Sequence, residues 1–128
     1  MPIVSHFYSS KFAIKSENMQ IIQVTDQPTR KLFHQVPHLI YKNDPNWACP
    51  LQGMVEETFD PAKNPSFKNG EAIRWILKDE KGQAVARIGA FINRKKAHTF
   101  EQPTGGCGFF ECINSFDAAK LLFDAARE

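Results

Sequence analysis

Apolar and polar positions along the chain predict four strands and three helices. The segment from Met19 to Thr25 is rich in β-branched residues and bounded by polar ones, which is typical of a strand. Thr25-Asp26-Gln27-Pro28 then offers an N-cap and a proline for the first turn of a helix. Apolar residues recur at helical spacing after this cap: Leu32, Phe33, Val36, Leu39 and Ile40. Pro37 lacks an amide hydrogen, so we expect the helix to break or kink near Val36.

The middle of the chain predicts an irregular stretch followed by a hairpin. Residues 43–67 contain four prolines, and they predict a loop with one short helix from Leu51 to Thr58. Two strands follow, Glu71–Asp79 and Ala84–Asn93, joined by a short loop that contains Gly82. One face of the first of these strands is apolar: Ile73, Trp75 and Leu77. We expect the two strands to form an antiparallel hairpin.

The last third of the chain predicts one more strand and a final helix. Residues 94–98 are a charged connection, and residues 106–113 form the strand, paired on to the hairpin. Asn114 or Ser115 caps the helix, which we expect to run from about residue 115 to Glu128. Its apolar face consists of Phe116, Ala119, Leu122, Phe123 and Ala126. The expected fold class is α/β, with a mixed, mainly antiparallel sheet of about four strands and flanking helices.

Length, composition and charge indicate one domain over residues 1–128. The chain is 42% hydrophobic and 23% charged, which is ordinary for a globular protein. A net charge of +2 is too small to imply a nucleic-acid or membrane partner. Met1–Asn18 mixes charged residues among its apolar ones and has no signal-peptide core, and no apolar run approaches the ~18 residues of a membrane span. The sequence therefore predicts a cytoplasmic protein without a membrane partner.

Three cysteines at no framework spacing predict reduced thiols rather than a disulfide scaffold: Cys49, Cys107 and Cys112. A regular strand would point Cys107 and Cys112 to opposite faces. A bulge could bring both to a metal ion together with His98, but buried structural thiols are the preferred interpretation.

A second candidate metal site is the pair His34 and His38, which has the i,i+4 spacing of ligands on a helix. Pro37 should interrupt the helix between them, and no third ligand is placed to complete a site. No metal site is therefore predicted.

Three segments of the chain, in order, resemble the opening of longer bacterial proteins of the acyl-CoA N-acyltransferase (GNAT) superfamily. They are Pro37-His-Leu-Ile-Tyr-Lys-Asn-Asp-Pro-Asn-Trp47, Asp60-Pro-Ala-Lys-Asn-Pro-Ser-Phe67, and Gly108-Phe-Phe-Glu-Cys-Ile113 followed by a helix with Leu122-Phe-Asp-Ala-Ala126. The element order also resembles the N-terminal half of the GNAT fold, and the resemblance covers about residues 20–128. It implies acyl transfer from acyl-CoA to an amine, and a GNAT-like domain that is incomplete at its C-terminal end.

The resemblance also implies where a cofactor and a base would lie. In the family, acyl-CoA occupies an opening between the fourth and fifth strands, and amides at the start of the next helix bind the pyrophosphate. The matching residues here are Ile113, Asn114 and Ser115, although an ordinary helix cap is the preferred interpretation of the last two. GNAT enzymes often place a general-base carboxylate on the fourth strand, where Glu111 lies. The alternative role of Glu111 is a charge that protects an exposed sheet edge.

The phosphate-binding turn departs from the family pattern. The segment Cys112–Ala118 contains no glycine, and Asp117 places a carboxylate at the helix N-terminus, where it stabilises the helix and repels a phosphate. The family's fifth strand, fourth helix and last strands have no counterpart. We therefore expect weak or absent binding of acetyl-CoA or another acyl-CoA by this chain alone.

Two further clusters have both a functional and a structural interpretation. Arg94, Lys95, Lys96 and His98 could bind RNA or a phosphate, but without a basic excess elsewhere a solvated loop is favoured. Tyr41 and Trp47, flanked by prolines, could form an aromatic wall for a ligand or pin a loop to the core.

Two functions remain open from sequence. One is a GNAT-related acyltransferase, with Glu111 as base, that is inactive or needs a partner; the other is a non-catalytic binding or assembly module that kept the fold. The strand Cys107–Ile113 would end the sheet as an edge with apolar side chains. We therefore predict a homo-oligomer, a two-fold dimer formed through this strand or the last helix.

Overall fold

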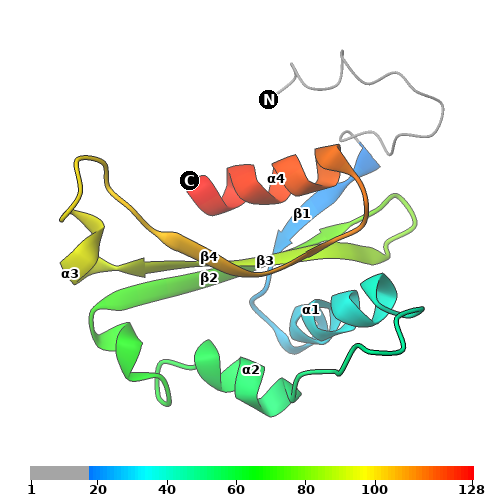
Figure 1. Cartoon of the computed structure of the whole chain (residues 1–128), viewed down its shortest axis with the longest axis horizontal. Helices are drawn as coiled ribbons and strands as arrows, with labels where there is room; N and C mark the ends of the chain where they lie inside the picture. The colour runs from blue at the N-terminus through cyan, green and yellow to red at the C-terminus, as the bar shows by residue number, and fades with distance from the viewer. Residues whose placement is uncertain (1–17) are drawn as a thin grey trace.

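Four antiparallel strands form one sheet, with helices on both faces (Figure 1). The computed structural model describes residues 18–128; the segment Met1–Asn18, for which the sequence predicts no targeting signal, lies outside them apart from Asn18. The strands pair in the order of the sequence, and they are β1 (Gln20–Gln23), β2 (Gly70–Lys78), β3 (Ala84–Asn93) and β4 (Gly106–Cys112). The expected hairpin and its extension through residues 106–113 are confirmed, as is the mainly antiparallel α/β fold class.

The helices divide between the two faces of the sheet. In order they are α1 (Gln27–Ile40), α2 (Gln52–Thr58), the 3₁₀ helix η3 (Pro65–Lys68), the single turn α3 (Arg94–Ala97) and α4 (Phe116–Arg127). Helices α1 and α2 lie on one face and α4 on the other (Figure 1). Both η3 and α3 occur where the sequence predicts only loop or charged connection. No helix within residues 18–128 has the length and apolar character needed to cross a membrane.

Helix α1 begins at a capping box. Asp26 is the N-cap: its Oδ1 accepts a hydrogen bond from the Thr29 amide at 2.9 Å, and Thr29 Oγ1 accepts one from the Asp26 amide at 3.2 Å. The hydrogen bonds from Thr29 hold the pKa of Asp26 below its usual value. This reciprocal pair satisfies two amides of the first turn, as the cap read from the sequence predicts.

The expected break at Pro37 is wrong, because α1 continues through it to Ile40. Pro37 has no amide hydrogen, so the helical hydrogen bond to the carbonyl of Phe33, four residues earlier, cannot form. The guanidinium of Arg87 on β3 supplies the missing donor: its Nη1 lies 3.1 Å from the Phe33 carbonyl oxygen. Both residues are buried, with Arg87 only 4% exposed. The helix tolerates an internal proline because the sheet satisfies the carbonyl that the proline leaves free.

Two apolar clusters occupy the two faces of the sheet. The cluster under α4 contains six buried residues: Leu77, Val85, Ala86, Ile88, Ala118 and Leu122. The cluster under α1 and α2 is built on Phe33, Val55 and Ile76, with Phe59 and Phe109 packed against it. The expected apolar face of β2 holds only in part, since Leu77 is buried but Ile73 is 40% exposed. The expected face of α4 is also partly wrong, because Ala118 and Leu122 are its buried apolar residues while Phe116 and Phe123 are exposed.

Strand β4 is the edge of the sheet and carries a bulge. Gly108 pairs with Gly89 and Glu111 with Arg87, so two residues of β4, Phe109 and Phe110, oppose one of β3. Phe109 adopts φ = 55°, a conformation that bulky side chains seldom occupy. The extra residue sends Phe109 to the rings of Phe33 and Phe59, and Phe110 to Phe123 of α4. The position of β4 at an edge is as expected, and the dimer stays a prediction.

We predict that the Phe33 carbonyl couples Arg87 to Pro37 energetically. Arg87→Met removes the donor and leaves this buried carbonyl unpaired, so it should lower the free energy of unfolding by about 1–3 kcal/mol. Pro37→Ala restores a helical amide at that position, so the same Arg87→Met change should cost markedly less in the Pro37→Ala background. Chemical denaturation of the four proteins of this double-mutant cycle measures the coupling. Equal costs in the two backgrounds would contradict it.

Candidate functional site

Glu111, the predicted base, lies on β4 directly opposite Arg87 of β3 and is half-buried. The hydroxyl of Tyr41, the residue that ends α1, donates a hydrogen bond of 2.5 Å to Glu111 Oε2. This bond is the main reason that the pKa of Tyr41 is raised, and the negative charge of Glu111 adds to it. Burial lowers the pKa of Arg87, while Glu111 and Tyr41 oppose that shift. The structure therefore places a carboxylate, a phenol and a buried cation together at the sheet edge.

Tyr41 and Trp47, the two aromatic residues considered from sequence, do lie together. Their rings stack with centroids 5.4 Å apart and planes 21° apart, and both side chains are half-buried. The ring of His38 meets Trp47 edge-on at 5.1 Å. These contacts pin the loop after α1 against the end of that helix, which is the structural role weighed above. They also place the rings of Trp47 and His38 next to the cluster of Glu111, Tyr41 and Arg87, which we call the Glu111 group.

Two of the three residues implied for cofactor binding, Ile113 and Ser115, engage in hydrogen bonds within the chain. The Ile113 amide donates to the Val85 carbonyl at 3.1 Å, and the Ser115 amide donates to the Ile113 carbonyl at 2.7 Å. Ser115 is the N-cap of α4, and its Oγ accepts from the Ala118 amide at 3.2 Å. Asn114 is exposed. At Ser115 the structure therefore shows the helix cap that the sequence also allows.

Asp117 lies in the first turn of α4, as expected, but its carboxylate is buried rather than directed to solvent. The residue is 7% exposed, and Oδ1 has no hydrogen-bond partner among the described residues. A negative charge in the first turn of a helix is favoured by the helix dipole. The turn after β4 thus already holds a carboxyl group of its own.

The cysteines differ from the expectation of buried structural thiols. All three are free, Cys49 and Cys107 are exposed, and Cys112 is half-buried, which raises the pKa of its thiol. The bulge in β4 does restore a common face, because Cys107 pairs with Ala90 and Cys112 with Ala86. These partners are four residues apart on β3, about 13 Å along a strand, so the two sulfur atoms do not converge.

His34 and His38 lie on one continuous helix, contrary to the expected interruption, but they have different partners. His34 Nε2 is 2.7 Å from Glu56 Oε1, and His38 Nε2 is 3.4 Å from Cys49 Sγ. Within residues 18–128, no three His, Cys, Asp or Glu side chains are grouped closely enough to hold a metal ion.

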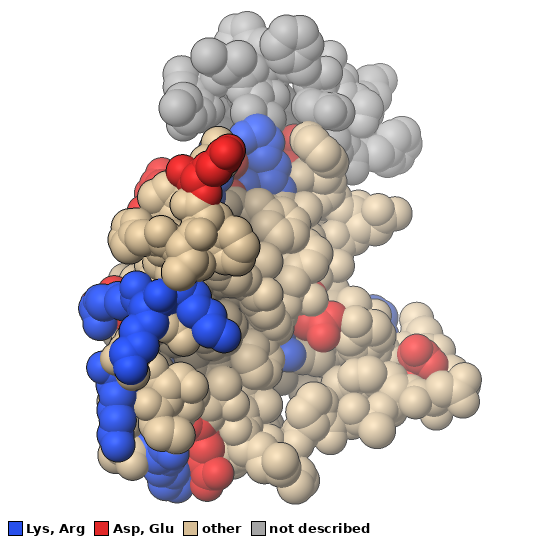
Figure 2. Space-filling view, turned by 60° about the vertical axis from the view of Figure 1, so that its left-hand side comes forward, with Lys and Arg blue, Asp and Glu red and all other residues tan. Residues whose placement is uncertain are grey.

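The basic cluster after β3 lies on the single turn α3. Arg94 pairs with Glu71 of β2, and the Asn93 side chain caps the turn by accepting from the Lys95 amide. Figure 2, in which the α3 end of the sheet comes forward, shows Lys and Arg side chains gathered along one side of this face, while uncharged residues cover most of the rest. The basic residues form a narrow exposed band rather than a broad patch.

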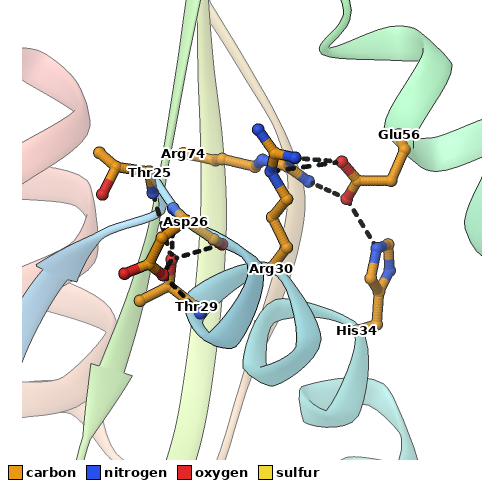
Figure 3. Close-up of polar contacts among 7 residues, drawn as sticks. All are labelled: Thr25, Asp26, Thr29, Arg30, His34, Glu56 and Arg74. Carbon is orange, nitrogen blue, oxygen red and sulfur yellow. Dashed lines mark hydrogen bonds and ion pairs between the residues drawn. The ribbon is translucent and has the colours of Figure 1, made fainter.

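A polar cleft between α1 and α2 was not anticipated from the sequence. Its volume is about 700 Å³, and its charged lining residues come from both helices, the loop after α2, and β2: Arg30, Lys31, His34, Glu56, Glu57, Asp60, Lys63 and Arg74. Glu56 of α2 points toward Arg30, His34 and Arg74 (Figure 3). Arg74 donates to both Glu56 oxygens at 2.7 Å, His34 contacts Oε1, and Arg30 Nε lies 3.9 Å from Oε2.

Arg74 is the most buried member of this network, 6% exposed, and its guanidinium stacks over two aromatic rings. The distances from its Cζ to the ring centroids are 4.3 Å for Phe59 and 5.0 Å for Phe33. The hydrogen bonds from Arg74 are the largest cause of the lowered pKa of Glu56. An arginine in the middle of an otherwise apolar strand was the available sequence signal for this cleft, because such a charge needs a buried partner.

Comparison with known proteins gives a similarity but no family. No protein-family model matches the chain, and no solved structure matches it. Protein YghO of Escherichia coli (strain K12) is 33% identical over 97 residues, which cover 76% of this chain and 24% of YghO. The chain thus spans about a quarter of the length of that relative, whose name states no activity, ligand or partner.

We predict that Glu56 stabilises the fold in a pH-dependent way. Glu56→Gln leaves buried Arg74 without a charged partner and should lower the free energy of unfolding near pH 7 by about 1–3 kcal/mol. Because the pKa of Glu56 is lower in the folded chain than its ordinary 4.5, this stabilisation is present above pH 4.5 and is lost as the pH falls through the folded value. Denaturation of both proteins between pH 7 and acid conditions measures the difference.

Glu57→Gln is the matched control, because Glu57 is adjacent, 56% exposed at its side chain, and pairs with exposed Lys63. Its effect should be small. A Glu56→Gln cost no larger than that of Glu57→Gln would show that the network does not stabilise the fold.

The contact between Tyr41 and Glu111 gives a spectroscopic prediction. Glu111→Gln removes the negative charge beside the phenol, so the pKa of Tyr41 should fall towards its ordinary value of 10.0. Ultraviolet titration in a Tyr8→Phe background isolates Tyr41, since the chain has only these two tyrosines. A Tyr41 titration unmoved by Glu111→Gln would mean that the hydrogen bond does not persist in solution.

Proposed function

We propose that this chain is a GNAT-related, acyltransferase-like domain whose acyl-CoA site is incomplete. The observation that carries the proposal is the arrangement of elements: β1, two helices on one face, the β2–β3–β4 meander, and α4 starting directly after β4 on the other face. This is the order that the resemblance implies for the N-terminal half of the fold. In this proposal the rest of the cofactor site would come from additional residues or from a partner chain.

In this proposal Glu111 is the base. An amine that attacks the thioester carbonyl forms a new C–N bond and must lose a proton, while the C–S bond breaks and CoA leaves as a thiolate. Glu111 would take the proton from the amine, and its position on the edge strand leaves it half-exposed to a substrate. Tyr41 occupies one carboxylate oxygen and fixes the side chain in place. The amine remains unspecified.

The alternative, a non-catalytic binding or assembly module, is favoured by Asp117. A phosphate at the start of α4 would meet a buried carboxylate in the first turn, in a segment with no glycine to let the backbone close on it. The two proposals differ in whether removing the charge of Asp117 should allow CoA to bind at this turn.

We predict that the wild-type chain alone binds acetyl-CoA weakly or not at all. Asp117→Asn removes the repulsive charge while keeping the size of the side chain, so it should strengthen binding measurably. Isothermal titration calorimetry with acetyl-CoA tests both proteins. Asp124→Asn is the matched control, since Asp124 lies further along the same helix but pairs with Lys120.

The outcomes separate the alternatives. A low-micromolar dissociation constant for the wild-type chain would overturn the proposal of an incomplete site. A gain with Asp117→Asn but not with Asp124→Asn would support CoA at the α4 N-terminus. Absence of binding in all three proteins would favour the non-catalytic module.

A further inference from the structure

The side chains of Cys49 and His38 face one another at the end of α1. Cys49 Sγ lies 3.4 Å from His38 Nε2, although the two residues are eleven positions apart in sequence. His38 lies in the last turn of α1 and Cys49 in the loop that follows. Both are exposed, so a dissolved reagent can reach the sulfur atom.

Aromatic contacts hold this pair next to the Glu111 group. Trp47 packs edge-on against the His38 ring and stacks on Tyr41, whose hydroxyl is bonded to Glu111. The loop between Tyr41 and Cys49 is also closed by three turn hydrogen bonds. The Asp44 amide donates to the Tyr41 carbonyl, the Asn46 amide to Asp44 Oδ1 and the Trp47 amide to the Asp44 carbonyl. The imidazole is therefore held by helix α1, and the thiol by a loop that these contacts fix against the end of the helix.

A buried cation lies within electrostatic reach of the sulfur atom. The charge of Arg87 interacts with Cys49 as well as with Glu111 and Tyr41. Cys107, the other exposed thiol, lies at the far end of β4, where it pairs with Ala90.

The Cys49 thiol donates to the Pro50 carbonyl oxygen at 3.3 Å, and its Sγ also lies 3.4 Å from His38 Nε2, which can accept the thiol hydrogen when the ring hydrogen is on Nδ1. A carbonyl only orients the hydrogen, whereas a neutral imidazole can remove it. A thiol beside an imidazole is the arrangement that makes cysteine a nucleophile, because the thiolate is the reactive form.

We propose that Cys49 is a nucleophilic thiol, with His38 as its base, that accepts an acyl group from a thioester. The thiol proton passes to His38 Nε2 and Sγ attacks the thioester carbonyl, forming a new C–S bond. The original C–S bond then breaks, and the leaving thiolate takes the proton from His38. Electrons and atoms balance without an oxidant or a further reactant. The thioester as acyl source rests on the proposed function; the pairing of thiol and imidazole does not.

The test uses S-acetyl-N-acetylcysteamine, a small acetyl thioester that lacks the nucleotide part of CoA. Short incubations of the full chain, followed by peptide mapping by mass spectrometry, give the acetylation rate at each cysteine. Cys49 should react about tenfold or more faster than Cys107, since a positioned base commonly contributes at least this much. Half-buried Cys112 should react slowest.

His38→Gln keeps a polar side chain but removes the base, so it should lower the rate at Cys49 to that at Cys107. His98→Gln, which changes an exposed histidine on the α3 side, is the control and should leave the rate unchanged. Equal rates at Cys49 and Cys107 in the wild-type chain, or a rate at Cys49 that survives His38→Gln, would overturn the proposal. Because the probe has no nucleotide, its result does not depend on CoA binding, so this inference and the proposed function can fail separately.

Discussion

The hydrogen bond from Arg87 to the Phe33 carbonyl connects the sheet to α1, and the arrangement on this face depends on it. A buried carbonyl without a donor is costly, and Pro37 would create one in the middle of the helix. Arg87 satisfies that carbonyl from the central strand β3 and stacks over the Phe33 and Phe109 rings at 4.7 and 5.8 Å. Its Nε has no partner among the described residues. The charge is therefore retained at some cost in desolvation, which lowers the pKa of Arg87.

A second buried arginine organises the other half of the same face. Arg74 and Arg87 lie on adjacent strands, and both guanidinium groups contact the Phe33 ring from β2 and β3. Arg74 forms an ion pair with Glu56 of α2, whereas Arg87 donates to a carbonyl and interacts with the charge of Glu111 without an ion pair among the described residues. Buried charges that require particular partners favour one register of helix on sheet over others, because a shifted helix would leave them unpaired. The position of short α2, which has only Val55 buried, follows from this pairing.

The edge strand β4 connects these interactions to function. Its bulge places Phe109 in one core and Phe110 against α4, so that one strand of seven residues contributes to both faces of the sheet. After β4, the amides of Ile113 and Ser115 in the turn into α4 are engaged in hydrogen bonds within the chain. The side chain of Asp117 is buried in the first turn of that helix. The polar chemistry of the chain is concentrated on the α1 side instead, where Glu111 and Tyr41 are joined through Trp47 to His38 and Cys49. The proposed base, Glu111, and the proposed nucleophile, Cys49, both belong to this group of residues on the α1 side.

The sequence predicted the strands, the hairpin and the fold class, together with an N-cap before each long helix, at Asp26 and at Asn114 or Ser115. It could do so because alternation, helical spacing and capping are local properties of neighbouring residues. Glu111 was also placed on the right strand by its sequence context. The continuation of α1 through Pro37 was not readable, since the compensating donor lies fifty-four positions from the carbonyl that it satisfies. The same holds for the Glu56–Arg74 cleft and for the contacts of Tyr41 with Glu111 and of His38 with Cys49. Which side chains satisfy a buried charge or a free carbonyl is decided by packing in three dimensions, and only the tertiary structure brings those partners within hydrogen-bonding distance.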